Sequence, residues 1–267
     1  MCKGSVLVEV IKSKDNATIK LYSKLANNRK DRKKYNQFVL EGVRIVLDAI
    51  SENAPIVQVL ISESAYDKYY KKLVDLNITK LLIISNELAC KISSTESTQG
   101  VFAICEIPKN YGITLKPNGK YIVLYQVQDP GNVGMIVRTA DAFGLDGVIL
   151  SQSCDFYSPK VIRSTMGSAF RVNHWICDDI FKLLNDFKLN KITTYSAIID
   201  SSNYVKDEKF LGGSAVVVGN EGNGLPSDVA NFCDKPITIE MSGNINSLNV
   251  AMASGIIMWK MSSSYEC

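Results

Sequence analysis

Three glycine- and asparagine-rich segments in the second half of the chain contain the residues best suited to hold a ligand. The clearest is AVVVGNEGNGLP, residues 215–226, where an apolar run breaks into a glycine loop around Glu221. Glycines let backbone N–H and C=O groups approach a ligand closely. The spacing is G-x-x-G-x-G, whereas a dinucleotide site needs G-x-G-x-x-G after a strand. We therefore expect another ligand, and disfavour a nucleotide-dependent oxidoreductase.

A second segment, QDPGNVGMIVRTADAFG at residues 128–144, joins a turn to a helix. Pro130 and Gly131 predict the turn, and Asn132 is expected to be the N-cap. Arg138 falls about two turns into the helix among apolar residues. A cation in such surroundings needs a partner or an anionic ligand. The alternative is an arginine that reaches solvent at the helix surface.

The third segment, IEMSGNINSLNVA at residues 239–251, places Ser247 and Asn249 at the start of the last helix. Either side chain could cap that helix or reach a substrate. The helix is apolar nearly all round, which predicts burial on more than one side. Ala251 and Gly255 are four residues apart and permit close approach of a second helix. A homodimer interface or a central core helix would each explain the pattern.

The elements around these segments alternate between strands and helices, which predicts an α/β fold. A short strand followed by a helix is expected in residues 37–50. Further strands are expected in residues 56–62, 80–85 and 100–107, and again in 121–128, 147–150, 191–199, 214–219 and 236–241. The apolar runs of the second series are typical of a parallel sheet covered on both faces. We expect one domain over residues 1–107, a linker over 108–119 and a second domain over 120–267.

Composition narrows the classes of protein further. With 267 residues and 46% apolar residues, the chain can build two cores. It lacks the apolar run of about 20 residues that a membrane span needs, and its N-terminus does not resemble a secretory signal, so we expect a cytoplasmic protein. The seven cysteines include no C-x-x-C pair, and we expect them to be reduced and mostly buried. A single histidine, His174, is expected to be structural, which disfavours hydrolases and metal sites.

A basic cluster lies near the N-terminus, in TIKLYSKLANNRKDRKK at residues 18–34. Such a cluster is typical of proteins that contact phosphate backbones, although a solvated helix end followed by a loop is the alternative. The residues expected to contact such a phosphate backbone are Arg29, Lys30, Arg32, Lys33 and Lys34.

Together the three segments resemble the signature motifs of the SpoU–TrmH branch of the SPOUT superfamily of RNA methyltransferases. The resemblance runs through DPGNVGMIVRTADAFG, VVVGNEGNGL and IEMSGNINSLNVAMA, with SPKVIRSTMGSAFRV between the first two, and covers residues 121–260. The N-terminal half resembles the L30e-like substrate-binding domain, through NNRKDRKKYNQFVLEGVRIVLDA and STQGVFAICEIP.

The resemblance implies a C-terminal α/β domain whose parallel sheet is threaded into a deep trefoil knot, beside a smaller N-terminal L30e-like α/β domain. It implies methyl transfer from S-adenosylmethionine to a ribose 2′-hydroxyl of RNA. The lack of metal-ligand spacing predicts that no metal takes part, and the apolar last helix favours a homodimer. Ribosomal RNA is the expected substrate, and transfer RNA or a non-catalytic RNA-binding role are the alternatives. The residues expected to bind the cofactor are Gly219, Asn220, Glu221, Gly222, Gly224, Ile239, Met241, Leu248 and Asn249.

The resemblance makes Arg138 the central catalytic residue. The residues expected around it are Asn132, Glu221, Ser247 and Asn249. Because a guanidinium stays protonated, we expect Arg138 to hold an RNA phosphate and orient the hydroxyl rather than act as a general base. Glu221 is expected to hold Arg138 in place, and Arg163 in VIRSTMG is expected to be a further RNA contact.

Overall fold

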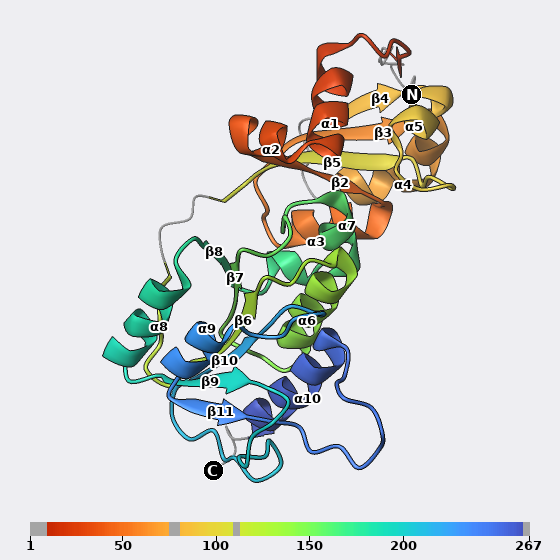
Figure 1. Ribbon diagram of the computed structural model, residues 1–267. Helices are drawn as coiled ribbons and strands as arrows, with labels where there is room; N and C mark the ends of the chain where they lie inside the picture. The colour runs from red at the N-terminus through yellow and green to blue at the C-terminus, as the bar shows by residue number, and fades with distance from the viewer. Residues whose placement is uncertain (1–9, 75–80, 109–112, 264–267) are drawn as a thin grey trace. The chain divides into compact units, whose positions relative to one another are not determined.

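The structure is a computed structural model that describes residues 10–74, 81–108 and 113–263. The chain forms two compact units (Figure 1). The first comprises Met1–Pro108 together with Tyr157–Arg163, and the second comprises Lys109–Phe156 and Ser164–Cys267. Part of the expected linker, 109–112, lies outside the described residues. Beyond it, Ile113 and Leu115 pack against the core of the second unit.

The first unit is built on a mixed sheet with the strand order β1-β4-β3-β5-β2. Strand β5 is antiparallel to β2 and β3, whereas β4 is parallel to β3 and β1. The short strand β1 was not expected from the sequence. The elements are β1 (Val10–Ile11), α1 (Ala17–Asn27), α2 (Arg29–Tyr35), β2 (Gln37–Glu41), α3 (Val43–Ser51), β3 (Ile56–Ser62), α4 (Glu63–Val74), β4 (Leu81–Ile84), α5 (Asn86–Ile92) and β5 (Val101–Glu106).

The basic cluster forms two helices rather than a helix end and a loop. Asn28 ends α1 and caps α2, because its side-chain oxygen accepts a hydrogen bond from the backbone N–H of Lys30 at 2.8 Å. Four cations of α2 are exposed: Arg29, Lys30, Lys33 and Lys34.

Arg32 differs from these four cations. It is only 6% exposed, and its Nη1 donates to the carbonyls of Leu25 and Ala26 at the end of α1. A guanidinium near a helix C-terminus satisfies carbonyls that have no partner in the helix. We therefore correct the expectation for Arg32: its guanidinium joins α2 to α1 and is not available to an RNA phosphate.

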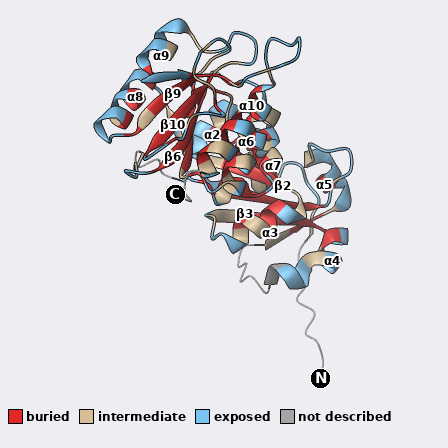
Figure 2. Ribbon diagram, turned by 90° about the horizontal axis from the view of Figure 1, so that it is seen from below, coloured by how far each residue is buried: buried red, intermediate tan, exposed pale blue. Residues whose placement is uncertain are grey.

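The second unit is built on a parallel sheet with the order β11-β9-β10-β6-β7-β8. Every residue of β6, β7 and β10 is buried (Figure 2). The elements are β6 (Lys120–Tyr125), α6 (Pro130–Ala142), β7 (Gly147–Ser151), α7 (Pro159–Ser164), the 3-10 helix η1 (Ser168–Phe170), β8 (His174–Cys177), α8 (Ile180–Leu189), β9 (Thr193–Ala197), β10 (Ser214–Val218), α9 (Ser227–Phe232), β11 (Lys235–Ile237) and α10 (Val250–Ser262). Most of α7 is grouped with the first unit.

Helices cover both faces of this sheet. On one face, Leu183 and Phe187 of α8 and Val229 of α9 share a core with alternate residues of the central strands, such as Val123 and Val217. The other face is covered by α6 and α10, which pack against each other and against the strands. The expected parallel sheet buried on both faces is confirmed. Strand β8, which contains His174, was not expected. Over the described residues, none of the helices has the length and apolar character needed to cross a membrane.

Candidate active site

The site lies where the two central strands end. Strands β6 and β10 are neighbours, but the helix after β6 covers one face of the sheet and the helix after β10 covers the other. In α/β sheets, ligands bind in the crevice that such a reversal opens at the carboxyl ends of the strands. The loop 219–224 after β10 and the turn 126–129 after β6 meet at this edge.

The glycine loop turns back on itself directly after β10. Asn220 and Gly224 exchange backbone hydrogen bonds of 3.0 and 2.9 Å, and the Asn220 side-chain oxygen accepts from Gly222 N and Asn223 N. A β-carbon added to Gly219 would lie 2.3 Å from the carbonyl carbon of Gly224. Gly224 itself has a φ of +67°, which L side chains rarely adopt. Both glycines are therefore needed for the shape of this loop.

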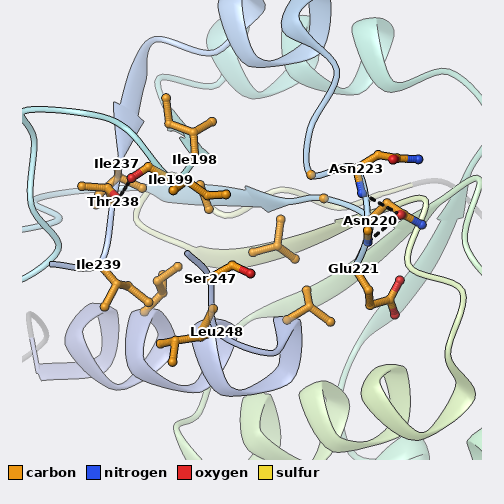
Figure 3. A pocket seen from close by; sticks show the side chains of 18 of the residues that line it. Ile198, Ile199, Asn220, Glu221, Asn223, Ile237, Thr238, Ile239, Ser247 and Leu248 are labelled. Atoms are coloured by element: carbon orange, nitrogen blue, oxygen red, sulfur yellow. Dashed lines mark hydrogen bonds between the residues drawn. The ribbon is translucent and has the colours of Figure 1, made fainter. Parts of the chain in front are cut away.

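A cavity of about 250 Å³ opens beneath the loop, close to the lower end of the range for small-molecule sites. Its walls come from loop 219–224, from the ends of β9 and β11, and from the segment before α10 (Figure 3). The residues expected to bind the cofactor that line the cavity are Gly219, Asn220, Glu221, Gly222, Gly224, Ile239, Met241 and Leu248. Ser247 also lines it, but Asn249 does not belong to the lining.

The cavity suits an adenosyl group that carries a positive charge. Aliphatic side chains such as Ile237, Leu248 and Ile257 form walls that a flat ring can pack against, and the tight glycine loop brings backbone donors and acceptors to the edge. Glu221 is the charged residue of the lining. A carboxylate at the mouth of an apolar cavity favours a cation such as a sulfonium.

A chain of side-chain hydrogen bonds joins the three motif segments. Asn249 Nδ2 donates to Asn132 Oδ1 at 3.1 Å, and Asn132 Nδ2 donates to Glu221 Oε1 at 3.1 Å. Asn249 is also the N-cap of α10, since its side-chain oxygen accepts from Ala251 N and Met252 N. The asparagines therefore connect the segment before α10 to the start of α6 and to the glycine loop.

Glu221 is held in its ionised form by this arrangement. Partial burial alone would raise the pKa of its carboxyl. Hydrogen bonds from its own backbone N–H, from the Asn132 side chain and from the amides of Asp129 and Gln128 outweigh that effect, and its pKa lies below its ordinary value.

The start of α6 differs from the expectation in one respect. Asp129, not Asn132, is the N-cap, and its carboxylate accepts from Asn132 N at 2.9 Å. Pro130 occupies the first helical position, where the missing N–H of proline costs nothing. An aspartate before a proline at a helix start was a readable signal that the sequence analysis missed. Because Asn132 lies within the first turn, its side chain is free to join Glu221 and Asn249.

Arg138 is exposed on α6, and within the described residues it makes no hydrogen bond or ion pair. The Glu221 carboxylate bonds to the start of α6 instead, so the expectation that Glu221 holds Arg138 directly is wrong. Arg163 belongs to the first unit, where its Nη1 donates to Ser94 Oγ at 3.2 Å and lies 3.9 Å from Glu41 Oε2.

The surroundings of His174 are those of a residue with a structural role, as expected. Its ring stacks on Phe156 at 3.9 Å, and burial lowers its pKa to about 4. The described cysteines form no disulfide, but only Cys105 and Cys233 among them are buried. For the described cysteines, the expectation that most are buried is therefore wrong. Cys2 and Cys267 lie outside the described residues.

Comparison with known proteins agrees with this geometry. The profile of the SpoU rRNA Methylase family matches residues 119–259, and that of the MRM3-like substrate binding domain matches residues 16–103. A similar curated protein is the 23S rRNA (guanosine(2553)-2′-O)-methyltransferase RlmP of Bacillus subtilis, which is 27% identical over 94% of this chain and 98% of its own. The 23S rRNA (uridine(2479)-2′-O)-methyltransferase of Streptomyces viridochromogenes is 25% identical over 92% of this chain and 89% of its own.

Solved structures are similar over nearly the whole chain. The SpoU methyltransferase AviRb from Streptomyces viridochromogenes, in complex with the cofactor AdoMet, superposes with a TM-score of 0.86 at 25% identity, over 94% of this chain and 98% of that one. An AdoMet-bound rRNA methyltransferase from Sinorhizobium meliloti gives a TM-score of 0.81 at 26% identity, over 97% and 99%. With the family profile spanning more than half of the sequence and all three motif segments, the chain belongs to the SpoU rRNA methylase family.

Proposed function

We propose that the chain transfers the methyl group of S-adenosylmethionine to a ribose 2′-hydroxyl of ribosomal RNA. The observation that carries the proposal is the junction of the three motif segments, in which Asn249, Asn132 and Glu221 are joined by hydrogen bonds beside the glycine-lined cavity. The named relatives that methylate ribose in 23S rRNA support the same reaction. The cytoplasm is the proposed location, because the two relatives named above come from bacteria, whose ribosomes lie there.

The cofactor, when bound, supplies an activated methyl group, so the protein has to hold and orient the two reactants. Gly219, Gly224 and the aliphatic walls would hold the adenosyl part, and the Glu221 carboxylate would favour its positive charge. Ser247 lies at the cavity wall and is exposed, so its hydroxyl is free to bond to the ribose.

Arg138 is proposed to bind the phosphate next to the target ribose. Its guanidinium has its donors free, because the described residues supply no partner for it. A planar guanidinium offers two parallel donors to a phosphate, which fixes the orientation of the nucleotide as well as its position. Asn132 and Asn249 act on this residue indirectly, by fixing the first turn of α6.

The exposed cations of α2, namely Arg29, Lys30, Lys33 and Lys34, are proposed to contact RNA phosphates away from the target. Such contacts raise affinity without reading sequence, and they make binding depend steeply on salt. Arg163 stays a proposed RNA contact, although its bond to Ser94 occupies one of its donors.

The chain is also proposed to act as a homodimer through α10. Met252, Ile256 and Trp259 recur on one face of this helix and are 58%, 37% and 59% exposed. Monomeric proteins rarely leave such an apolar face uncovered. At Gly255, helix α10 lies close to α6 of the same chain, because a β-carbon added to Gly255 would lie 3.9 Å from Thr139 Cγ2. The proposed interface is therefore the exposed face and not the Ala251–Gly255 pair.

The test is a methyl-transfer assay with labelled S-adenosylmethionine and unmodified transcripts of ribosomal RNA and of transfer RNA. We expect label at one ribose of the ribosomal transcript, and label in transfer RNA alone would replace the proposed substrate. Arg138→Ala and Arg138→Lys should both lose activity, because a point charge cannot replace a bidentate contact. In calorimetry, both Arg138 variants should bind the cofactor with an affinity within about threefold of the wild type, a free-energy difference of roughly 0.7 kcal/mol. A lysine variant with normal turnover would remove the phosphate role.

A further inference from the structure

Two glutamines at the carboxyl ends of neighbouring strands have an uncommon backbone conformation. Gln126 follows β6 with a φ of 57°, and Gln152 follows β7 with a φ of 51°. Positive φ is uncommon outside glycine, and the exceptions favour asparagine and aspartate, whose short side chains bond locally. Strained backbone of this kind clusters at ligand sites. Two such glutamines at the ends of neighbouring strands indicate a role other than ending the strands.

The two side chains are joined to each other. Gln126 Nε2 donates to Gln152 Oε1 at 2.9 Å. A third glutamine, Gln128, donates from its side chain to the backbone carbonyl of Gln152, also at 2.9 Å. Within the described residues, Gln126 Oε1 and Gln152 Nε2 have no further partner, and Gln152 is exposed. The pair therefore presents one free acceptor and one free donor, both fixed in position.

This pair lies directly beside the cofactor cavity. Asn220 Nδ2 donates to the backbone carbonyl of Gln126 at 2.9 Å, and the backbone N–H of Gln128 donates to Glu221 Oε2 at 3.3 Å. Asn220 and Glu221 both line the cavity. A ribose that presents its 2′-hydroxyl at the cavity carries its base on the adjacent carbon, which puts this edge of the sheet within reach of the base.

We infer that Gln126 and Gln152 read the base of the target nucleotide, an inference that rests on the proposed ribose methylation. A primary amide has both donors and acceptors, and every RNA base presents donors and acceptors along its Watson–Crick edge. Proteins recognise RNA sequence mainly where the bases are unstacked and their Watson–Crick edges are accessible. The bond between the two amides fixes which atoms face the base. Gln128 is a positioning residue, because it acts through the backbone of Gln152.

The test uses glycine, which adopts positive φ without strain. Gln126→Gly and Gln152→Gly can keep the backbone conformation while they remove the side chain with its amide. The control is Lys191→Gly, which makes the same backbone change at a φ of 56° after α8. The target is first mapped with the wild-type protein on an unmodified ribosomal RNA transcript. Methylation is then measured on four transcripts that differ only at the mapped base.

Each glycine variant should lower kcat/KM on the native transcript by about 10- to 100-fold, the discrimination that a bidentate base contact supplies. The differences among the four transcripts should shrink. Calorimetry should show unchanged affinity for S-adenosylmethionine, and Lys191→Gly should behave as wild type. Gln152→Glu is the second variant: it keeps the acceptor for Gln126 but replaces the free donor by an acceptor, and should change which base is preferred.

Glycine variants with wild-type kcat/KM and the same base preference would overturn the base-reading role while the proposed function stands. A Gln152→Glu variant with unchanged preference would do the same, even if a glycine variant failed to fold. A wild-type protein that binds S-adenosylmethionine but methylates no RNA would instead refute the proposed function, and the inference with it.

Discussion

Alanine at Gly219 would force the cofactor loop to open. The new β-carbon would lie 2.3 Å from the carbonyl carbon of Gly224, 2.4 Å from its oxygen and 2.5 Å from the nitrogen of Leu225. These are backbone atoms, so no rotation of a side chain can relieve the contact. The loop would have to separate at the point where Asn220 and Gly224 exchange their two hydrogen bonds.

The size of the effect follows from these contacts. Forcing an extra methyl group into a packed site costs about 1–3 kcal/mol, and each lost hydrogen bond adds about 0.5–1.5 kcal/mol. We expect the free energy of unfolding of the second unit to fall by about 3 kcal/mol. At about 2–4 °C per kcal/mol for a unit of this size, its melting temperature should fall by about 6–12 °C.

Two neighbouring glycines supply matched controls. In Gly222→Ala the nearest atom is Asn220 Oδ1 at 3.5 Å, an ordinary contact, and this variant should be close to wild type. In Gly224→Ala nothing lies within 4 Å, but the φ of +67° costs about 1–2 kcal/mol. Thermal unfolding should therefore rank Gly222→Ala as most stable and Gly219→Ala as least stable.

Calorimetry with S-adenosylmethionine completes the comparison. Gly219→Ala should bind the cofactor at least roughly tenfold more weakly, a loss of about 1.4 kcal/mol, because the moved loop withdraws its backbone groups from the cavity. A Gly219→Ala protein as stable as Gly222→Ala, and with the same cofactor affinity, would refute the close approach on which this reasoning rests.

Three further predictions concern other parts of the chain. Arg32→Ala should lower the free energy of unfolding of the first unit by about 1–3 kcal/mol in urea titrations. Lys33→Ala should leave that stability unchanged and reduce the salt dependence of RNA binding, measured by filter retention. Equal stability of the two variants would contradict the structural role of Arg32. His174 has a pKa of about 4 in the folded protein against 6.5 ordinarily. As pH falls, the histidine of the unfolded chain therefore takes up a proton before that of the folded protein. The wild type should lose stability between pH 6.5 and 4, and melting curves of His174→Phe over the same pH range should lack this loss. Trp259→Glu should yield a monomer in analytical ultracentrifugation, and a wild type that is itself monomeric at micromolar concentration would exclude the α10 interface.

The sequence predicted best those features that depend on local spacing. Buried strands such as 214–218 are continuous apolar runs, and the glycine loop 219–224 follows one of them directly, so both could be located without a structure. Of the nine residues expected to bind the cofactor, all but Asn249 line the cavity, whereas lining residues such as Ile198, Thr238 and Ile257 were not expected. Asn249 is adjacent to lining residues in the sequence, but it points away to cap α10 and to reach Asn132.

Features that depend on how separate elements pack together were beyond sequence reasoning. Arg32 is one of five cations within six positions, and nothing in its local sequence separates it from Lys33. Only the fold, which brings it against Leu25 and Ala26, makes it structural. Gln126 and Gln152 are similar cases, because a positive φ at a glutamine has no propensity signal and their pairing depends on the register of β6 and β7.

The contacts of Glu221 explain how the glycine loop 219–224 and Arg138 could act together, in the roles proposed for them, without touching. A direct ion pair between Glu221 and Arg138 would neutralise the guanidinium and compete with an RNA phosphate for its donors. The structure instead uses Glu221 to fix the first turn of α6 through Asn132 and the amides of Gln128 and Asp129. Arg138 lies about two turns further along the same helix, so fixing the first turn also helps to fix its position. Because the guanidinium is exposed, its donors are available to the RNA phosphate that we propose it binds.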